Sequence, residues 1–105
     1  MNIDRLHNIF FLGIGGIGMS ALARYFNAKG VEVSGYDKTP SDLTCELQQE
    51  GIKIWFEDRQ DIIPTHIDLV VYTPAVPKTT VLFNTLSTRN IPMIKRAELL
   101  GLLTR

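Results

Sequence analysis

A glycine-rich stretch near the N-terminus has the spacing of a phosphate-binding loop. Gly13, Gly15 and Gly18 fit the pattern G-x-G-x-x-G, with Gly16 as an extra glycine. In such a loop the first glycine allows a tight turn, and the second has no Cβ, so a phosphate can reach the backbone. The third lets the helix pack close to the strand. Because an apolar run ending at Leu12 precedes the loop and a helical pattern follows it, the helix start is expected to present unpaired N–H groups to a diphosphate.

Two further segments are expected beside this loop. Asp37 ends the next apolar run, 19 residues beyond Gly18, where a carboxylate can accept hydrogen bonds from ribose hydroxyls. The segment Thr73–Pro77 directly follows a later apolar run, and its two prolines make it stiff. Open α/β sheets bind ligands at the carboxyl ends of their strands, so the glycine loop, Asp37 and Thr73–Pro77 are predicted to line one crevice.

The composition excludes several classes of function. The 11 basic and 11 acidic residues balance, so there is no electrostatic footprint for nucleic acid or an anionic membrane surface. Cys45 is the only cysteine, which excludes an internal disulfide and a cysteine-based metal cluster and fits a reducing compartment. We interpret Cys45 as a packing residue of a helix. The acidic residues Glu57, Asp58 and Asp61 are expected to form a solvated face and no metal site.

No segment has the pattern of a membrane span or a signal peptide. The N-terminus lacks a long apolar core, and no run approaches the roughly 18 apolar residues of a transmembrane helix. We therefore predict a cytoplasmic protein with no membrane partner. The 105 residues are enough for one domain with one core.

Short apolar runs alternate with helical patterns in the order β-α-β-α-β-β-α-β-α. This order predicts a Rossmann-like α/β fold, an open and mostly parallel five-stranded sheet of strand order 3-2-1-4-5 with helices on both faces. The expected strands are His7 to Leu12, Val31 to Asp37, Ile52 to Phe56, Ile67 to Tyr72 and Ile91 to Ile94. The expected helices are Ile17 to Lys29, a segment opened by residues 39–42 and ended by Gly51, Thr79 to Arg89, and a last one that begins near Lys95.

The helical spacing also predicts which side chains face the core. In the first helix these are Ile17, Ala21, Leu22, Tyr25 and Ala28; in the second, Leu43 and Leu47; in the third, Leu82 and Leu86; and in the last, Leu99, Leu100 and Leu103. Pro40 suits the first turn of the second helix, with Thr39 or Ser41 as its cap. Pro92 places the fifth strand at an edge of the sheet or opens it.

Four sequence blocks together carry a family resemblance. They are residues 13–20 (GIGGIGMS), 34–37 (SGYD), 72–76 (YTPAV) and 95–100 (KRAELL). From His7 to its last residue the chain resembles the N-terminal domain of the Mur ligases, in particular of the branch that adds L-alanine to UDP-N-acetylmuramate in peptidoglycan synthesis for the cell wall. Each block alone is weak, whereas the first and last together are quite specific.

The resemblance implies a division of labour between domains. In that family the N-terminal domain holds the UDP part of the substrate, the central domain carries an ATP-binding P-loop, and the C-terminal domain closes over the site. ATP phosphorylates the muramoyl carboxylate, and the amine of L-alanine attacks the acyl phosphate. By resemblance, the UDP-binding residues here are Gly13, Ile14, Gly15, Gly16, Ile17, Gly18, Met19, Ser20, Asp37, Thr73, Pro74, Ala75 and Arg96, with the glycine loop on the diphosphate and Asp37 near the ribose or uracil.

Two departures from the family pattern qualify this expectation. Relatives often have Gly-His where this chain has Glu57-Asp58, so Asp58 is left out of the site. The chain also lacks G-x-x-x-x-G-K-[ST], and with it the ATP-binding lysine and the magnesium hydroxyl. We therefore expect residues 1–105 to be a single UDP-binding domain, a piece of a ligase without the ATP-binding and C-terminal domains. It is expected to be inactive alone, with no catalytic residue or cofactor of its own, while ATP and Mg²⁺ serve the full-length enzyme.

Two other interpretations stay open at this point. The glycine motif and Asp37 also fit an NAD-binding Rossmann domain of a dehydrogenase or a regulatory module, because an acid at that position holds an adenosine ribose. A purely structural or partner-binding domain is the third. Binding of UDP, UDP-N-acetylmuramate or NAD would distinguish the three.

Overall fold

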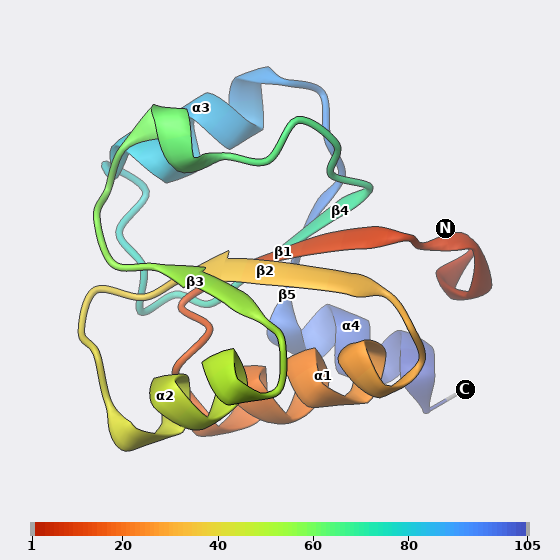
Figure 1. Ribbon diagram of the computed structural model, residues 1–105. Coiled ribbons are helices and arrows are strands. Elements are labelled where there is room, and N and C mark those ends of the chain that lie inside the picture. Colours follow the sequence, from red (N-terminus) through yellow and green to blue (C-terminus); the bar gives the residue numbers. More distant parts are fainter. Residues whose placement is uncertain (1, 105) are drawn as a thin grey trace.

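The computed structural model describes residues 2–104, and its centre is a five-stranded parallel sheet (Figure 1). The strands lie in the order β3-β2-β1-β4-β5, as the sequence predicts, and all neighbouring pairs are parallel. Their bounds are β1 (Asn8–Leu12), β2 (Glu32–Tyr36), β3 (Lys53–Trp55), β4 (Leu69–Tyr72) and β5 (Met93–Lys95). Pro92 directly precedes β5, which is an edge strand as expected.

In the described part of the chain, four helices cover the two faces of this sheet. In Figure 1, α1 (Ile17–Ala28), α2 (Asp42–Gln49) and α4 (Arg96–Leu103) lie below the sheet, and α3 (Val81–Thr88) lies above it. Two short 3-10 turns, Ile3–Arg5 and Gln60–Ile62, complete the elements. Within residues 2–104 no helix is long and apolar enough to cross a membrane.

Strand β1 is central because its side chains are apolar on both faces. Ile9 and Phe11 belong to the core under α1, α2 and α4, whereas Phe10 and Leu12 belong to the core under α3. All four are almost completely buried. A parallel strand covered by helices on both sides requires such a continuous apolar run. β2 and β3 extend the sheet on one side of β1, and β4 and β5 extend it on the other. The switch point of the sheet therefore lies between β1 and β4.

The predicted buried face of α1 is wrong except at Leu22, which is buried. Ile17 is 86% exposed, and Ala21, Tyr25 and Ala28 are exposed as well. The core side is formed instead by Met19, Ser20, Leu22, Ala23 and Phe26. Both sets have helical spacing, so periodicity alone cannot choose between them. The set with Met19 and Phe26 packs against the sheet, in the apolar cluster that includes Ile9 and Phe11.

Smaller differences concern α2 and α4. Cys45 is exposed on α2, so it is not the packing residue that we expected. Pro40 lies outside the helix, before the N-cap residue Ser41, whose side chain accepts from the N–H of Thr44. On α4, Leu99 is fully buried, but Leu100 is 44% exposed because it lies on the side of the helix away from the sheet.

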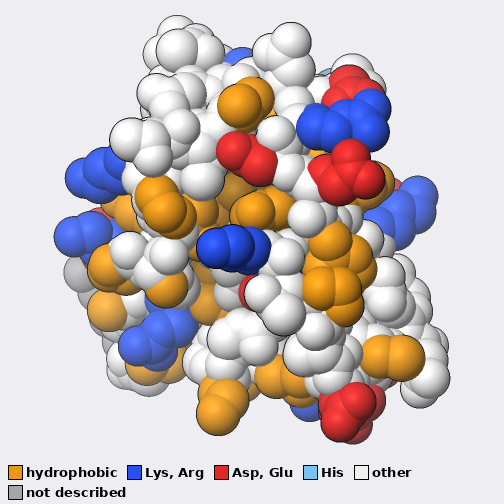
Figure 2. Space-filling view, turned by 90° about the vertical axis from the view of Figure 1, so that its left-hand side faces the viewer, with side chains coloured by type: hydrophobic (Ala, Val, Ile, Leu, Met, Phe, Trp, Pro, Cys, Tyr) orange, Lys and Arg blue, Asp and Glu red, His pale blue; other side chains and the backbone are white. Residues whose placement is uncertain are grey.

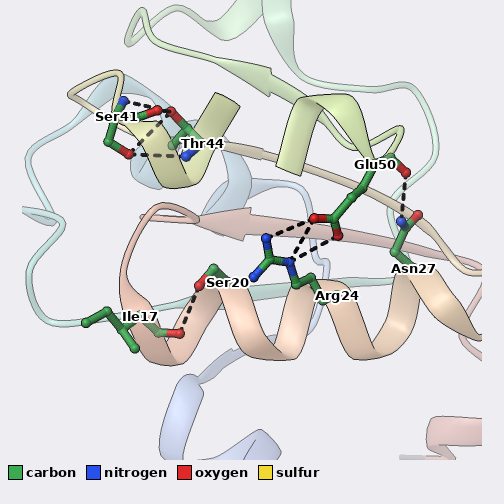
Figure 3. Close-up of polar contacts among 7 residues, drawn as sticks. All are labelled: Ile17, Ser20, Arg24, Asn27, Ser41, Thr44 and Glu50. Carbon is green, nitrogen blue, oxygen red and sulfur yellow. Dashed lines mark hydrogen bonds and ion pairs between the residues drawn. The ribbon is translucent and has the colours of Figure 1, made fainter. Parts of the chain in front are cut away.

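Polar contacts tie α1 to the end of α2 (Figure 3). The Arg24 guanidinium donates to both carboxylate oxygens of Glu50, at 2.9 to 3.1 Å, and the Asn27 amide donates to the Glu50 carbonyl oxygen at 3.0 Å. The carboxylate raises the pKa of Arg24, chiefly through these hydrogen bonds. Since both side chains are well exposed, the pair aligns the two helices and adds little to stability.

Gly35 of β2 allows the loop after β1 to cross the sheet closely. A Cβ on Gly35 would lie 2.6 Å from the Phe11 carbonyl oxygen and 2.8 Å from Cδ1 of Ile14, which is itself fully buried. Backbone cannot move away as a flexible side chain can, so this strand position requires glycine.

We expect Gly35→Ala to destabilise the domain by about 1–3 kcal/mol, because the added methyl overpacks a rigid site. Thermal or urea unfolding measures the change. Gly101→Ala is the matched control: a Cβ there meets nothing within 4 Å, and alanine replaces glycine inside a helix, so the variant should be more stable by about 0.5–1 kcal/mol. Equal stability of the two variants would contradict the close crossing at Gly35.

Candidate functional site

A cavity of about 420 Å³ opens at the carboxyl edge of the sheet, beside the glycine loop. Figure 2 faces this edge and shows hydrophobic side chains gathered at its middle, with basic side chains to one side and a mixed acidic and basic group to the other. The cavity combines three segments far apart in the sequence, as predicted. Its lining residues are Gly13, Gly16, Tyr36, Asp37, Lys38, Thr73, Ala75, Val76, Pro77 and Thr80.

The end of β2 fixes the shape of the glycine loop. The N–H groups of Gly13 and Ile14 both donate to the Tyr36 carbonyl oxygen, at 2.8 and 3.0 Å. The N–H of Gly15 donates to Oδ2 of Asp37 at 2.8 Å, and Oδ1 of Asp37 accepts from the N–H of Thr39. Asp37 therefore holds the loop, while the remaining lone pairs of its carboxylate stay available to a ligand.

The first turn of α1 has donors that the protein does not use. The first helical bond runs from the Ser20 N–H to Gly16, and within residues 2–104 the N–H groups of Ile17, Gly18 and Met19 have no partner. The N-cap residue is Gly16, which has no side chain to cap them. The other helices each have a side-chain oxygen at their start: Ser41 for α2, Thr80 for α3 and Glu98 for α4.

Arg96 lies against this same turn. A Cβ on Gly18 would be 3.0 Å from Cδ of Arg96 and 3.1 Å from its Nη1, so the side chain crosses directly over Gly18. Among the described residues no carboxylate pairs with Arg96. The start of a helix carries a partial positive charge, which a guanidinium reinforces. Both features are complementary to an anion with several oxygens, such as a diphosphate.

The glycines of the motif serve partly different purposes from those expected. Gly13 has φ +90°, which confirms its role in a tight turn. A Cβ on Gly15 would lie 2.7 Å from the Asp37 carboxylate and 3.0 Å from Cγ2 of Thr44. Gly15 therefore makes room for Asp37 and α2, and the approach of a phosphate to its backbone stays a prediction. Gly18 makes room for the Arg96 side chain, and not for the strand as predicted.

The other expected site residues differ in what they expose. Thr73 and Ala75 line the cavity, whereas Pro74 is exposed outside it. Ile14, Met19 and Ser20 are buried in the core or under the helix, and the Ser20 hydroxyl donates to the Ile17 carbonyl oxygen. These three side chains pack behind the glycine loop and the start of α1, and none of them lines the cavity.

Sequence reasoning missed Tyr36, Lys38 and Thr80, which also line the cavity. Tyr36 and Lys38 flank Asp37, so their position at a strand end was a signal for them. Burial raises the pKa of the Tyr36 phenol above its ordinary value, and the carboxylates of Asp58 and Asp37 raise it further. The phenol consequently keeps its proton at neutral pH and remains a hydrogen-bond donor.

Asp58 is not part of a solvated acidic face, contrary to the prediction. Its two carboxylate oxygens accept from the N–H groups of Val81 and Leu82, each at 2.8 Å, at the start of α3. Glu57 and Asp61 are exposed and pair with Arg59, as a solvated face would. Asp58 thus stabilises the helix whose preceding residues, Pro77 and Thr80, form one wall of the cavity.

Comparison with known proteins identifies the family of the chain. The model of the Mur ligase family, catalytic domain, matches residues 8–105. The chain belongs to the Mur ligase family.

Individual Mur ligases resemble the chain along its whole length. It is 54% identical to the UDP-N-acetylmuramate–L-alanine ligase of Flavobacterium psychrophilum and 51% identical to that of Flavobacterium johnsoniae, in each case over 100% of this chain. The chain spans 24% of the length of either relative.

A solved Mur ligase structure has the same fold. The UDP-N-acetylmuramate–alanine ligase of Thermotoga maritima superposes with a TM-score of 0.84 at 32% identity, over 89% of this chain and 21% of that one. The UDP-N-acetylmuramate:L-alanyl-γ-D-glutamyl-meso-diaminopimelate ligase of Neisseria meningitides superposes with a TM-score of 0.74 at 25% identity, over 87% of this chain and 29% of that one.

The position of Arg96 predicts an effect on the stability of the Mur ligase domain without ligand. Arg96 is the first residue of α4 and also crosses the start of α1, so its charge opposes two helix dipoles. Arg96→Met should raise the free energy of unfolding by roughly 0.3–1 kcal/mol, and the thermal midpoint with it. Arg89 lies at the C-terminal end of α3, where a cation is favourable, so Arg89→Met should lower it. Shifts in the same direction would contradict this electrostatic assignment.

Proposed function

We propose that this chain is the UDP-binding domain of a ligase that joins L-alanine to UDP-N-acetylmuramate in peptidoglycan synthesis. The family match, the 54% identity to a protein of that name and the similar fold of a solved example support this proposal. The observation that carries it is the juxtaposition of Arg96 with the uncapped start of α1, next to a cavity lined by Asp37.

The ligand would occupy two adjoining regions. Its diphosphate would accept hydrogen bonds from the first turn of α1 and from the Arg96 guanidinium. Its nucleoside would enter the cavity, whose walls include the apolar side chains of Val76 and Pro77 and the polar groups of Asp37 and Lys38. Charge-assisted hydrogen bonds fix the diphosphate, and burial of the flat ring adds to the affinity.

ATP and Mg²⁺ are assigned to other parts of the ligase. The sequence contains no Gly-Lys dipeptide and hence no P-loop, and the described residues include no group of three or more His, Cys, Asp or Glu placed to hold a metal. We assign to this chain only the positioning of UDP-N-acetylmuramate for acyl-phosphate formation and attack by L-alanine. A cytoplasmic location stays a prediction.

Calorimetric titration of the 105-residue chain tests the proposal. UDP-N-acetylmuramate and UDP should bind. NAD should not, because NAD binding is the property of the alternative function, a Rossmann domain of a dehydrogenase or a regulatory module. Arg96→Met should weaken UDP binding about tenfold or more, because a hydrogen bond to a charged group is worth roughly 1.5–3 kcal/mol. Binding of NAD in preference to UDP would support a dinucleotide-binding domain and contradict the proposal.

The chain alone should not hydrolyse ATP. Transfer of a γ-phosphoryl group requires a cradle of backbone donors with a cation and Mg²⁺, and the one glycine loop of the sequence is assigned to the diphosphate of UDP. Phosphate release is measured with UDP-N-acetylmuramate, L-alanine, ATP and Mg²⁺, against a reaction without protein. Release that Arg96→Met abolishes would show that this chain carries catalytic machinery of its own.

A further inference from the structure

Tyr36 is the last residue of β2 and a wall of the cavity. Its side chain is only 7% exposed and packs with the apolar cluster under α3, which includes Leu12, Val76 and Leu82. The ring is therefore held in place by packing, and the hydroxyl at its tip has a fixed position.

The Tyr36 hydroxyl has no hydrogen-bond partner among residues 2–104. In the same part of the chain, every fully buried side-chain nitrogen or oxygen has a partner. It follows that the hydroxyl is not fully enclosed. Since Tyr36 lines the cavity, we infer that the hydroxyl opens into it. A rigid tyrosine thus offers an unused polar group to whatever enters the cavity.

The neighbouring groups determine which ligand atom suits this hydroxyl. Since the phenol keeps its proton, it can donate to a carbonyl oxygen. The Asp37 carboxylate in the same cavity can only accept. A ring edge that carries a carbonyl oxygen next to an N–H group complements this pair. Uracil has such an edge. In cytosine the two positions are exchanged, because the ring nitrogen accepts and the neighbouring amino group donates, so a hydroxyl and a carboxylate that are held in place for uracil face the wrong groups.

We infer that Tyr36 is a specificity-determining residue of the nucleotide site, whose hydroxyl donates to a carbonyl oxygen of the uracil ring. This inference rests on the proposed function, because it assumes that the cavity holds the nucleoside of UDP. Tyr36 and Asp37 together then select uracil, while the start of α1 and Arg96 hold the diphosphate without regard to the base.

The test compares UDP with CDP, which share the ribose and diphosphate and differ only in the ring edge. The unmodified chain should bind UDP more tightly than CDP. Tyr36→Phe removes the hydroxyl and keeps the packed ring, so the variant should fold with a similar thermal midpoint. It should lose roughly three- to tenfold in affinity for UDP and less for CDP, so that the ratio of the two affinities falls.

Tyr25→Phe is the matched control, because Tyr25 is exposed on α1 and does not line the cavity. This variant should leave both affinities unchanged. An unchanged ratio in Tyr36→Phe, or no preference for UDP in the unmodified chain, would overturn the inference. Failure of the unmodified chain to bind either nucleotide would instead contradict the proposed function on which it rests.

Discussion

Three consecutive backbone N–H groups, those of Gly13, Ile14 and Gly15, donate to the last residue of β2 and to Asp37 directly after it. This attachment gives the site its geometry. It uses up the donors on the strand side of the loop, so the donors that remain are those at the start of α1. It also holds the Asp37 carboxylate at the cavity, beside the region that we propose for the diphosphate.

The electrostatics of the site oppose the stability of the free domain. Asp58, Ser41 and Glu98 each stabilise the start of a helix, whereas the start of α1 meets a guanidinium and a glycine cap. An arrangement that leaves donors unused and places like charges together has a cost in the free state, which a bound anion would offset. Functional sites commonly retain such locally unfavourable features.

The sequence predicted the features of this fold that depend on residues close to one another along the chain. The strand order and the turn at Gly13 follow from apolar runs, their spacing and a glycine between a strand and a helix. The purposes of Gly15 and Gly18 could not be predicted, because the groups that crowd them, Asp37 and Arg96, come from distant parts of the chain.

The same limit explains the errors on α1 and at Asp58. Two apolar stripes with equal helical spacing compete on α1, and only packing against the sheet decides between them. Asp58 caps a helix that begins more than twenty residues later, which no local pattern shows. Tyr36 could have been considered from its place before Asp37, but its unused hydroxyl is apparent only once the cavity is known.

The central position of β1 has a consequence for how the chain folds during synthesis. On one side β1 pairs with β2, which follows after a single helix, so this unit can form early. On the other side Ile9 pairs with Leu69, which the ribosome adds only after α2, β3 and the turn Gln60–Ile62. Until then one edge of a highly apolar strand lacks its partner and is open to pairing with other chains. Slow, non-local pairing of this kind makes the nascent domain a candidate for chaperone protection.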